Sequence, residues 1–108
     1  MTKMELEVYS DSSNHAVIAP PGRRFPGSVI QGDSLASLCD EVRQVALWVK
    51  SHSAEDDDVR WTVLSIQRQL LDRTLHYQSV LRANGIALPY ATPVSNADLV
   101  NLVDQGGR

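Results

Sequence analysis

A chain of 108 residues has the length of one small domain, and a content of 43% hydrophobic and 21% charged residues is typical of a folded globular protein rather than a disordered one. The net charge of −3 lacks the basic excess that most nucleic-acid-binding proteins carry, so we expect no nucleic-acid partner. Cys39 is the single cysteine, which excludes an intrachain disulfide and a disulfide scaffold.

The N-terminal residues also bear on the location of the protein. The first ten residues alternate charged and apolar side chains, whereas a signal peptide has a basic stretch followed by an apolar one. The longest strictly apolar run, residues 45–49, is far shorter than the roughly 20 residues of a membrane-spanning helix. We therefore expect a cytoplasmic protein with no membrane partner.

Three short strands are predicted in the first third of the chain. Residues 4–9 alternate apolar and polar side chains, which is the period of a strand with one buried face. Turn-forming residues 11–14 connect this strand to a second one at residues 16–19, as in an antiparallel hairpin. A Pro-Pro-Gly sequence ends the second strand, and residues 28–31 have the pattern of a third.

A first helix is predicted over residues 35–50, with Asp33 or Ser34 as its N-cap. Its apolar residues recur at helical spacing and define one stripe: Leu35, Leu38, Cys39, Val42, Val45, Ala46 and Val49.

A second helix is predicted from about residue 55 to Ala83, with Ser53 as its N-cap and Asn84–Gly85 as its C-terminal cap. Its apolar residues cover more than one stripe, and about 29 residues would make it about 43 Å long, which exceeds a compact domain of this size. We therefore expect a homodimer whose interface contains Trp61, Leu64, Leu71 and Leu75. The alternative is that residues 86–103 fold back over the same stripe.

The order of these elements predicts an α+β fold, with a three-stranded antiparallel sheet followed by two helices in two layers. Two prolines argue against a helix directly after Gly85, and Ser95 or Asn96 is placed to cap a short C-terminal helix over residues 97–103. The ends of chains fray, so we expect residues 105–108 to be poorly ordered. The expected division is a single domain over residues 1–88 and a C-terminal extension over residues 89–108.

Gly32-Asp33-Ser34-Leu35 matches the letters that open one family of serine esterases. A serine nucleophile needs a general base and an oxyanion hole, and the nearest Asp and His, Asp72 and His76, have the wrong spacing and fall inside the second helix. We therefore interpret the motif as a strand-to-helix turn, predict no catalytic residues, and keep a small serine hydrolase that uses Ser34 as the alternative. Asp72 and His76 lack a third ligand at matching spacing, so no metal site and no cofactor are predicted.

The loop with Arg23, Arg24 and Phe25 is the best candidate for a ligand- or partner-binding patch, because arginine and aromatic residues are enriched at binding hot spots. The alternative is that Phe25 fills the core while the arginines face solvent. These residues suggest a non-enzymatic binding or regulatory protein that acts through a surface on another protein. An immunity-type protein that occludes a toxin is one version of this hypothesis.

The string from Arg24 to Leu35, R-F-P-G-S-V-I-Q-G-D-S-L, resembles the central motif R-F-P-G-x-x-I-Q-G-D-S-L of a small bacterial family known only as a domain of unknown function. The similarity extends over most of residues 4–84. The resemblance implies a bacterial origin, and it implies no activity and no catalytic residues.

Overall fold

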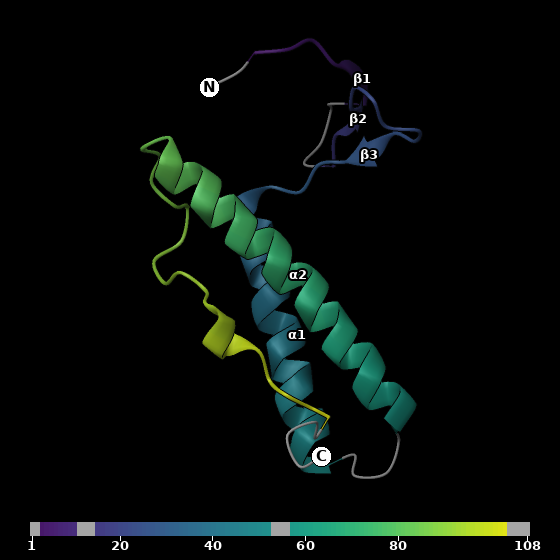
Figure 1. The fold of residues 1–108 in the computed structure, drawn as a ribbon, viewed down its shortest axis with the longest axis vertical. Helices are drawn as coiled ribbons and strands as arrows, with labels where there is room; N and C mark the ends of the chain where they lie inside the picture. The colour runs from purple at the N-terminus through teal and green to yellow at the C-terminus, as the bar shows by residue number, and fades with distance from the viewer. Residues whose placement is uncertain (1–2, 11–14, 53–56, 104–108) are drawn as a thin grey trace. The chain divides into compact units, whose positions relative to one another are not determined.

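A computed structural model describes residues 3–10, 15–52 and 57–103 of the chain. The chain divides into two compact units, Met1–Gln31 and Gly32–Arg108 (Figure 1). The first unit holds a three-stranded antiparallel sheet and the second holds two helices and a 3-10 turn, which confirms the predicted α+β class. The turn predicted at residues 11–14, the helix start predicted at 53–56 and the fraying predicted for 105–108 lie outside the described residues.

The sheet unit has the strand order β1 (Glu7–Ser10), β2 (Val17–Ala19) and β3 (Gly27–Ser28). β1 pairs with β2 and β2 pairs with β3, so the order along the chain is also the order in the sheet, and both pairs are antiparallel. Between β2 and β3 the N–H of Arg23 donates to the carbonyl of Pro20 at 3.2 Å, and Gly22 has a φ of +75°. This is the geometry of a type II turn, in which proline precedes a glycine of positive φ.

No described residue of the sheet unit is buried. The side chains of β2 are half-buried, whereas Val8 and Tyr9 of β1 are 54% and 61% exposed. Small sheets gain their stability by covering an apolar face. In this unit the apolar side chains are exposed or half-buried, so the unit has no enclosed core of its own among the described residues.

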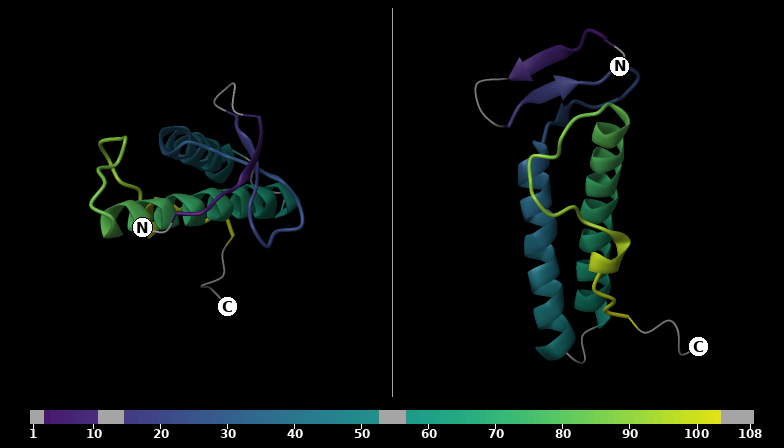
Figure 2. Two further views of the ribbon diagram at one scale, coloured as in Figure 1. Left: turned by 90° about the horizontal axis from the view of Figure 1, so that it is seen from above. Right: turned by 90° about the vertical axis from the view of Figure 1, so that its left-hand side faces the viewer.

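The helical unit is built on α1 (Gly32–His52) and α2 (Asp57–Ala83), which run antiparallel (Figure 2). The start of α1 lies against the end of α2, because the ring of Tyr77 fills the space where a Cβ of Gly32 would lie. The other ends meet where a guanidinium nitrogen of Arg60 donates to the carbonyl of Val49 at 3.4 Å.

The start of α1 corrects one prediction. The helix begins at Gly32, so Asp33 and Ser34 lie in its first turn and neither is the N-cap. The carboxylate of Asp33 nevertheless accepts the N–H of Ser34 at 2.9 Å, which satisfies one of the N–H groups that the first turn leaves free.

The end of α2 confirms the predicted glycine cap. Gly85 has a φ of +66°, its N–H donates to the carbonyl of Arg82, and the N–H of Ile86 donates to the carbonyl of Leu81 at 2.9 Å. This pair of hydrogen bonds is the Schellman motif, which a residue in the left-handed region makes possible.

The chain then turns back along the helices as an extended segment. Its only helical element among the described residues is the 3-10 turn η1 (Asn96–Asp98), which is shorter than the helix predicted over 97–103. In η1 the Ser95 hydroxyl accepts the N–H of Ala97, and the Asp98 carboxylate accepts the N–H of Ser95, which form a capping box. Leu99 is extended and ends the turn.

The core of this unit includes the C-terminal segment. Ala46 and Val49 of α1 pack with Val100 and Leu102, and Val63 of α2 packs against this cluster. The segment therefore belongs to the same compact unit as the helices. The boundary between the two compact units lies after Gln31.

Candidate functional site

Among the described residues of its unit, the serine of the esterase-like motif is not hydrogen-bonded to a catalytic partner. Ser34 is exposed, and its hydroxyl forms no hydrogen bond with the described residues of the helical unit. Gly32 has a packing role, because a Cβ at this position would overlap the Tyr77 ring. The structure thus accounts for the glycine of the motif by close packing of α1 on α2.

The predicted binding loop is exposed. Arg23 and Arg24 are both exposed, and Phe25 is 69% exposed, so Phe25 does not fill the core of its unit. The Arg24 guanidinium carbon lies 5.3 Å from the centre of the Phe25 ring, a cation–π distance. The patch is accessible in the sheet unit, and its role as a binding site stays a prediction.

The residues expected at a dimer interface divide into two groups. Leu64 and Leu71 are 1% and 5% exposed, Leu75 is half-buried, and Trp61 is 46% exposed. Leu64 and Leu71 are buried by the chain's own helices and C-terminal segment, as in the alternative fold-back arrangement. The dimer itself stays a prediction.

Two buried glutamines of α2 hold the C-terminal segment. The amide of Gln67 donates to the carbonyl of Val100 and accepts its N–H, each at 2.9 Å. Gln78 forms the same pair with Val94, at 3.0 and 2.9 Å, and its oxygen also accepts the hydroxyl of Tyr90 at 2.9 Å. Each side chain thus satisfies both polar groups of one backbone residue, as a neighbouring strand would.

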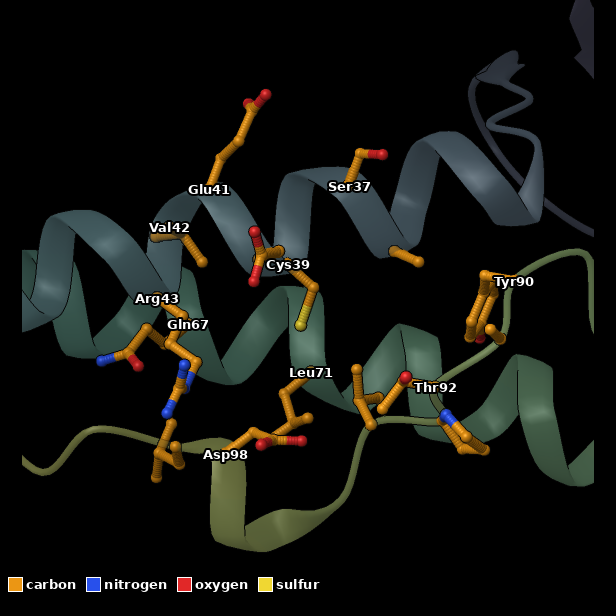
Figure 3. Close-up of a pocket in the computed structure, with 16 residues that line it drawn as sticks. Ser37, Cys39, Glu41, Val42, Arg43, Gln67, Leu71, Tyr90, Thr92 and Asp98 are labelled. Atoms are coloured by element: carbon orange, nitrogen blue, oxygen red, sulfur yellow. The ribbon is translucent and has the colours of Figure 1, made fainter.

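Between these two attachments, the segment, α1 and α2 line a partly open cavity of about 600 Å³ (Figure 3). This volume lies within the range of small-molecule sites in proteins. Its wall combines apolar and polar side chains from all three elements: Cys39 and Arg43 of α1, Leu71 of α2, Tyr90 and Thr92 of the segment, and Asp98 of η1. Figure 3 shows Ser37 and Glu41 directed away from the cavity and the Cys39 sulfur directed toward α2.

The cavity holds charges of both signs that are not paired with each other. Arg43 lies on α1, and its Nε is buried without a hydrogen-bond partner. Asp98 lies on η1, where one carboxylate oxygen accepts the N–H of Ser95, and Asp40 is an exposed acidic residue at the wall. Within the described part of the chain, Arg43 forms no ion pair. Buried donors nearly always have a hydrogen-bond acceptor in folded proteins. The Nε of Arg43 is therefore the group in the cavity wall that lacks an acceptor.

The thiol in the cavity is not a nucleophile at neutral pH. Burial raises the pKa of Cys39 above its ordinary value of 9.0, and the carboxylates of Asp98 and Asp40 raise it further, against a hydrogen bond with the side chain of Thr74 that lowers it. The reactive form of cysteine is the thiolate. Burial likewise raises the pKa of Tyr90, so both groups stay neutral in this site.

No group of three metal-ligating side chains occurs among the residues that the structure describes. Likewise, none of the described helices is long and apolar enough to cross a membrane.

Three residues of the candidate site and its attachments were not identified from the sequence. Arg43, Gln67 and Gln78 were assigned to no site, because each fits an ordinary polar position on a helix. The sequence does contain a pattern that could have identified the glutamines. They are 11 residues apart, about three helical turns, and lie among the apolar residues of the buried stripe. No comparable signal distinguishes Arg43.

The fold and the cavity define a class: an α+β protein whose antiparallel helix pair is closed on one side by a C-terminal segment that completes a mixed-polarity cavity. The chain belongs to DUF6959, a family of unknown function whose model matches residues 1–90. The match ends at Tyr90, so most of the segment that closes the cavity lies beyond it. Comparisons with curated proteins and with solved structures give no match.

Proposed function

We propose that this protein is a non-enzymatic binding protein whose ligand site is the cavity between α1, α2 and the C-terminal segment. The observation that carries the proposal is the buried Nε of Arg43, which has no partner and lies in the cavity wall. A guanidinium binds carboxylates in a bidentate geometry, and a ligand carboxylate would supply the missing acceptor.

The other charges in the cavity narrow the ligand class. Asp40 and Asp98 favour a positively charged group beside the anion, since each is a carboxylate without an ion pair in the described chain. The apolar part of the wall, with Leu71 and Tyr90, suits a hydrocarbon or aromatic portion of the ligand. The ligand that matches all three features is a small amino-acid-like molecule that carries both a carboxylate and an amine.

Three compound classes test this proposal: apolar and aromatic L-amino acids, the amines that lack their carboxylate, and the acids that lack their amine. Thermal shift and calorimetry should detect binding of the amino acids at millimolar concentration or below, and weaker binding of both truncated classes. Arg43→Gln should abolish binding, while Arg68→Gln, at an exposed position of α2 outside the cavity, should leave it unchanged. If Arg43→Gln binds as well as the unmodified chain, or if no amino acid binds, the proposal is wrong.

A second candidate function is protein binding through the loop of the sheet unit. The exposed Phe25 ring with Arg24 beside it favours this function, because the two side chains offer apolar area and positive charge together. An acidic protein surface is the partner of matching chemistry. Alongside this second function we propose an immunity-type role, a cytoplasmic location and a bacterial origin.

The serine hydrolase alternative has less support. Ser34 is an exposed residue in the first turn of α1, and its hydroxyl forms no hydrogen bond with a basic side chain among the described residues of its unit. Covalent labelling of Ser34 by a serine-directed phosphonate would restore this alternative, and we expect no labelling.

A further inference from the structure

The part of the C-terminal segment that lines the cavity is fixed at both of its ends. At one end it follows Gly85, whose positive φ and Schellman hydrogen bonds set the exit of the chain from α2. At the other end Val100 and Leu102 are buried in the core cluster, and Gln67 makes two hydrogen bonds to Val100. We call residues 86–99, which lie between these two ends, the strap.

Between its ends the strap is attached by one side chain. Among the described residues, every hydrogen bond between residues 87–99 and the helices is made by Gln78, which bonds Val94 and Tyr90. No residue of the strap is buried, and residues 91–93 are exposed. Segments with few buried side chains are the least stable parts of a native structure. The strap should therefore open more readily than the helices unfold.

The strap supplies the whole contribution of the C-terminal segment to the cavity wall. Figure 3 shows Tyr90, Thr92 and Asp98 on the segment, across the cavity from Cys39 of α1. Displacement of the strap would therefore remove one wall of the cavity.

The other two walls, α1 and α2, are held together more firmly. At one end of the helix pair Gly32 packs directly on the Tyr77 ring, and at the other end Arg60 donates to the carbonyl of Val49. Leu64 of α2 is 1% exposed. Separation of the helices would expose this buried surface to water, so the strap is the wall that moves with the least disruption.

The opening of the cavity does not reach the groups that line its inner side. The cavity is partly open, yet the Nε of Arg43 is buried and Cys39 is 7% exposed. A ligand carboxylate must come within about 3 Å of this nitrogen to accept its hydrogen. One wall of the cavity must therefore move before a ligand binds there.

We propose that the strap is the gate of the cavity: it lifts from α2 when Gln78 releases Val94 and Tyr90, admits the ligand, and closes over it. Val100 and Leu102 stay in the core while the strap opens. This inference rests on the proposed ligand site, because it describes how a ligand reaches the cavity.

The two attachments differ in what their release exposes. When the strap lifts, water replaces Val94 and Tyr90 as the partner of the Gln78 amide, so no buried polar group is left without a hydrogen bond. Release at Gln67 would in addition expose the buried side chains of Val100 and Leu102 to water. The gate therefore opens at Gln78, and Gln67 holds the fixed end.

Cys39 offers a direct measurement of the opening, because it is the single cysteine of the chain and lies in the cavity wall. Iodoacetamide alkylates a thiol that becomes accessible, and the intact mass of the full chain reports the extent of reaction. At low urea concentration the rate should be nearly independent of urea, because lifting the strap exposes little surface. A steep rise should follow only where the whole protein unfolds.

Four substitutions test which attachment opens. Gln78→Ala removes three hydrogen bonds and should raise the rate without urea by about 100-fold, and Tyr90→Phe removes one and should raise it about 5-fold. Gln67→Ala should raise it less than Gln78→Ala, since the core still holds Val100. Gln69→Ala, at an exposed position of α2, is the control and should stay within about 2-fold. Circular dichroism should show that the variants keep their helix content.

Three results would overturn the gate. The first is a rate for the unmodified chain that follows the urea dependence of global unfolding from the lowest concentration. The second is equal rates for Gln78→Ala and Gln69→Ala, and the third is a larger effect of Gln67→Ala than of Gln78→Ala. Amino-acid binding by calorimetry is a separate measurement. Modification that is independent of urea without amino-acid binding would refute the ligand site alone, whereas amino-acid binding without local opening would refute the gate alone.

Discussion

Replacement of Gln78 by alanine should release the C-terminal segment from the helices. Gln78 is 4% exposed, and its amide makes three hydrogen bonds of 2.9–3.0 Å to Val94 and Tyr90. Each such bond contributes about 1 kcal/mol net, so the loss of three corresponds to about 3 kcal/mol. Release of the segment would allow water to satisfy the freed groups, so we expect the free energy of unfolding to fall by about 2–4 kcal/mol.

The measurement combines urea-induced unfolding, followed by circular dichroism, with hydrogen exchange of the Val94 N–H. Tyr90→Phe removes one of the three bonds and should cost about 1 kcal/mol. Gln69→Ala is the matched control, because Gln69 is exposed on the same helix and bonds only Ser65, so its cost should stay below about 0.5 kcal/mol. Suppose that the free energy of unfolding of Gln78→Ala differs by less than about 0.5 kcal/mol from that of the unmodified chain, and that the Val94 N–H stays protected from exchange. The hydrogen bonds of Gln78 would then not hold the segment on the helices.

Two further predictions follow from the packing of the helices. Gly32→Ala should lower the free energy of unfolding by about 1–3 kcal/mol in denaturant titration, because the added Cβ overlaps the Tyr77 ring, and this overlap outweighs the higher helix propensity of alanine. Tyr77→Leu in the same chain should recover part of this loss. If the effects of the two substitutions are fully additive, this account is wrong. Since burial raises the pKa of Cys39 above 9.0, the folded state holds the thiol proton more tightly than the unfolded state does. The corresponding stability is fully present below pH 9.0 and is lost as the pH rises through the folded pKa, so Cys39→Ala should reduce the alkaline loss of stability, and an unchanged pH dependence would refute this assignment.

Local sequence signals determined the order of the elements. The end of the second strand at Pro20–Gly22 and the cap at Gly85 depend on neighbours within a few residues, and both occur as predicted. Helical periodicity likewise located α1 and α2, because the burial of one stripe requires that spacing. The start of α1 differed by three residues, since several polar residues in a row offer equivalent caps, and the close packing of Gly32 on Tyr77 selects among them.

Only the tertiary structure decided how the apolar surface of α2 is divided. The sequence showed that one stripe was not enough for its apolar residues, but periodicity does not specify what covers each side. Gln67 is 33 residues from its partner Val100, and no local pattern encodes a hydrogen bond at that separation. The same long-range attachment brings Asp98 toward Arg43 and so creates the cavity. The residues that make the site were each unremarkable as members of a helix or a loop, because their chemistry depends on which segments the fold places side by side.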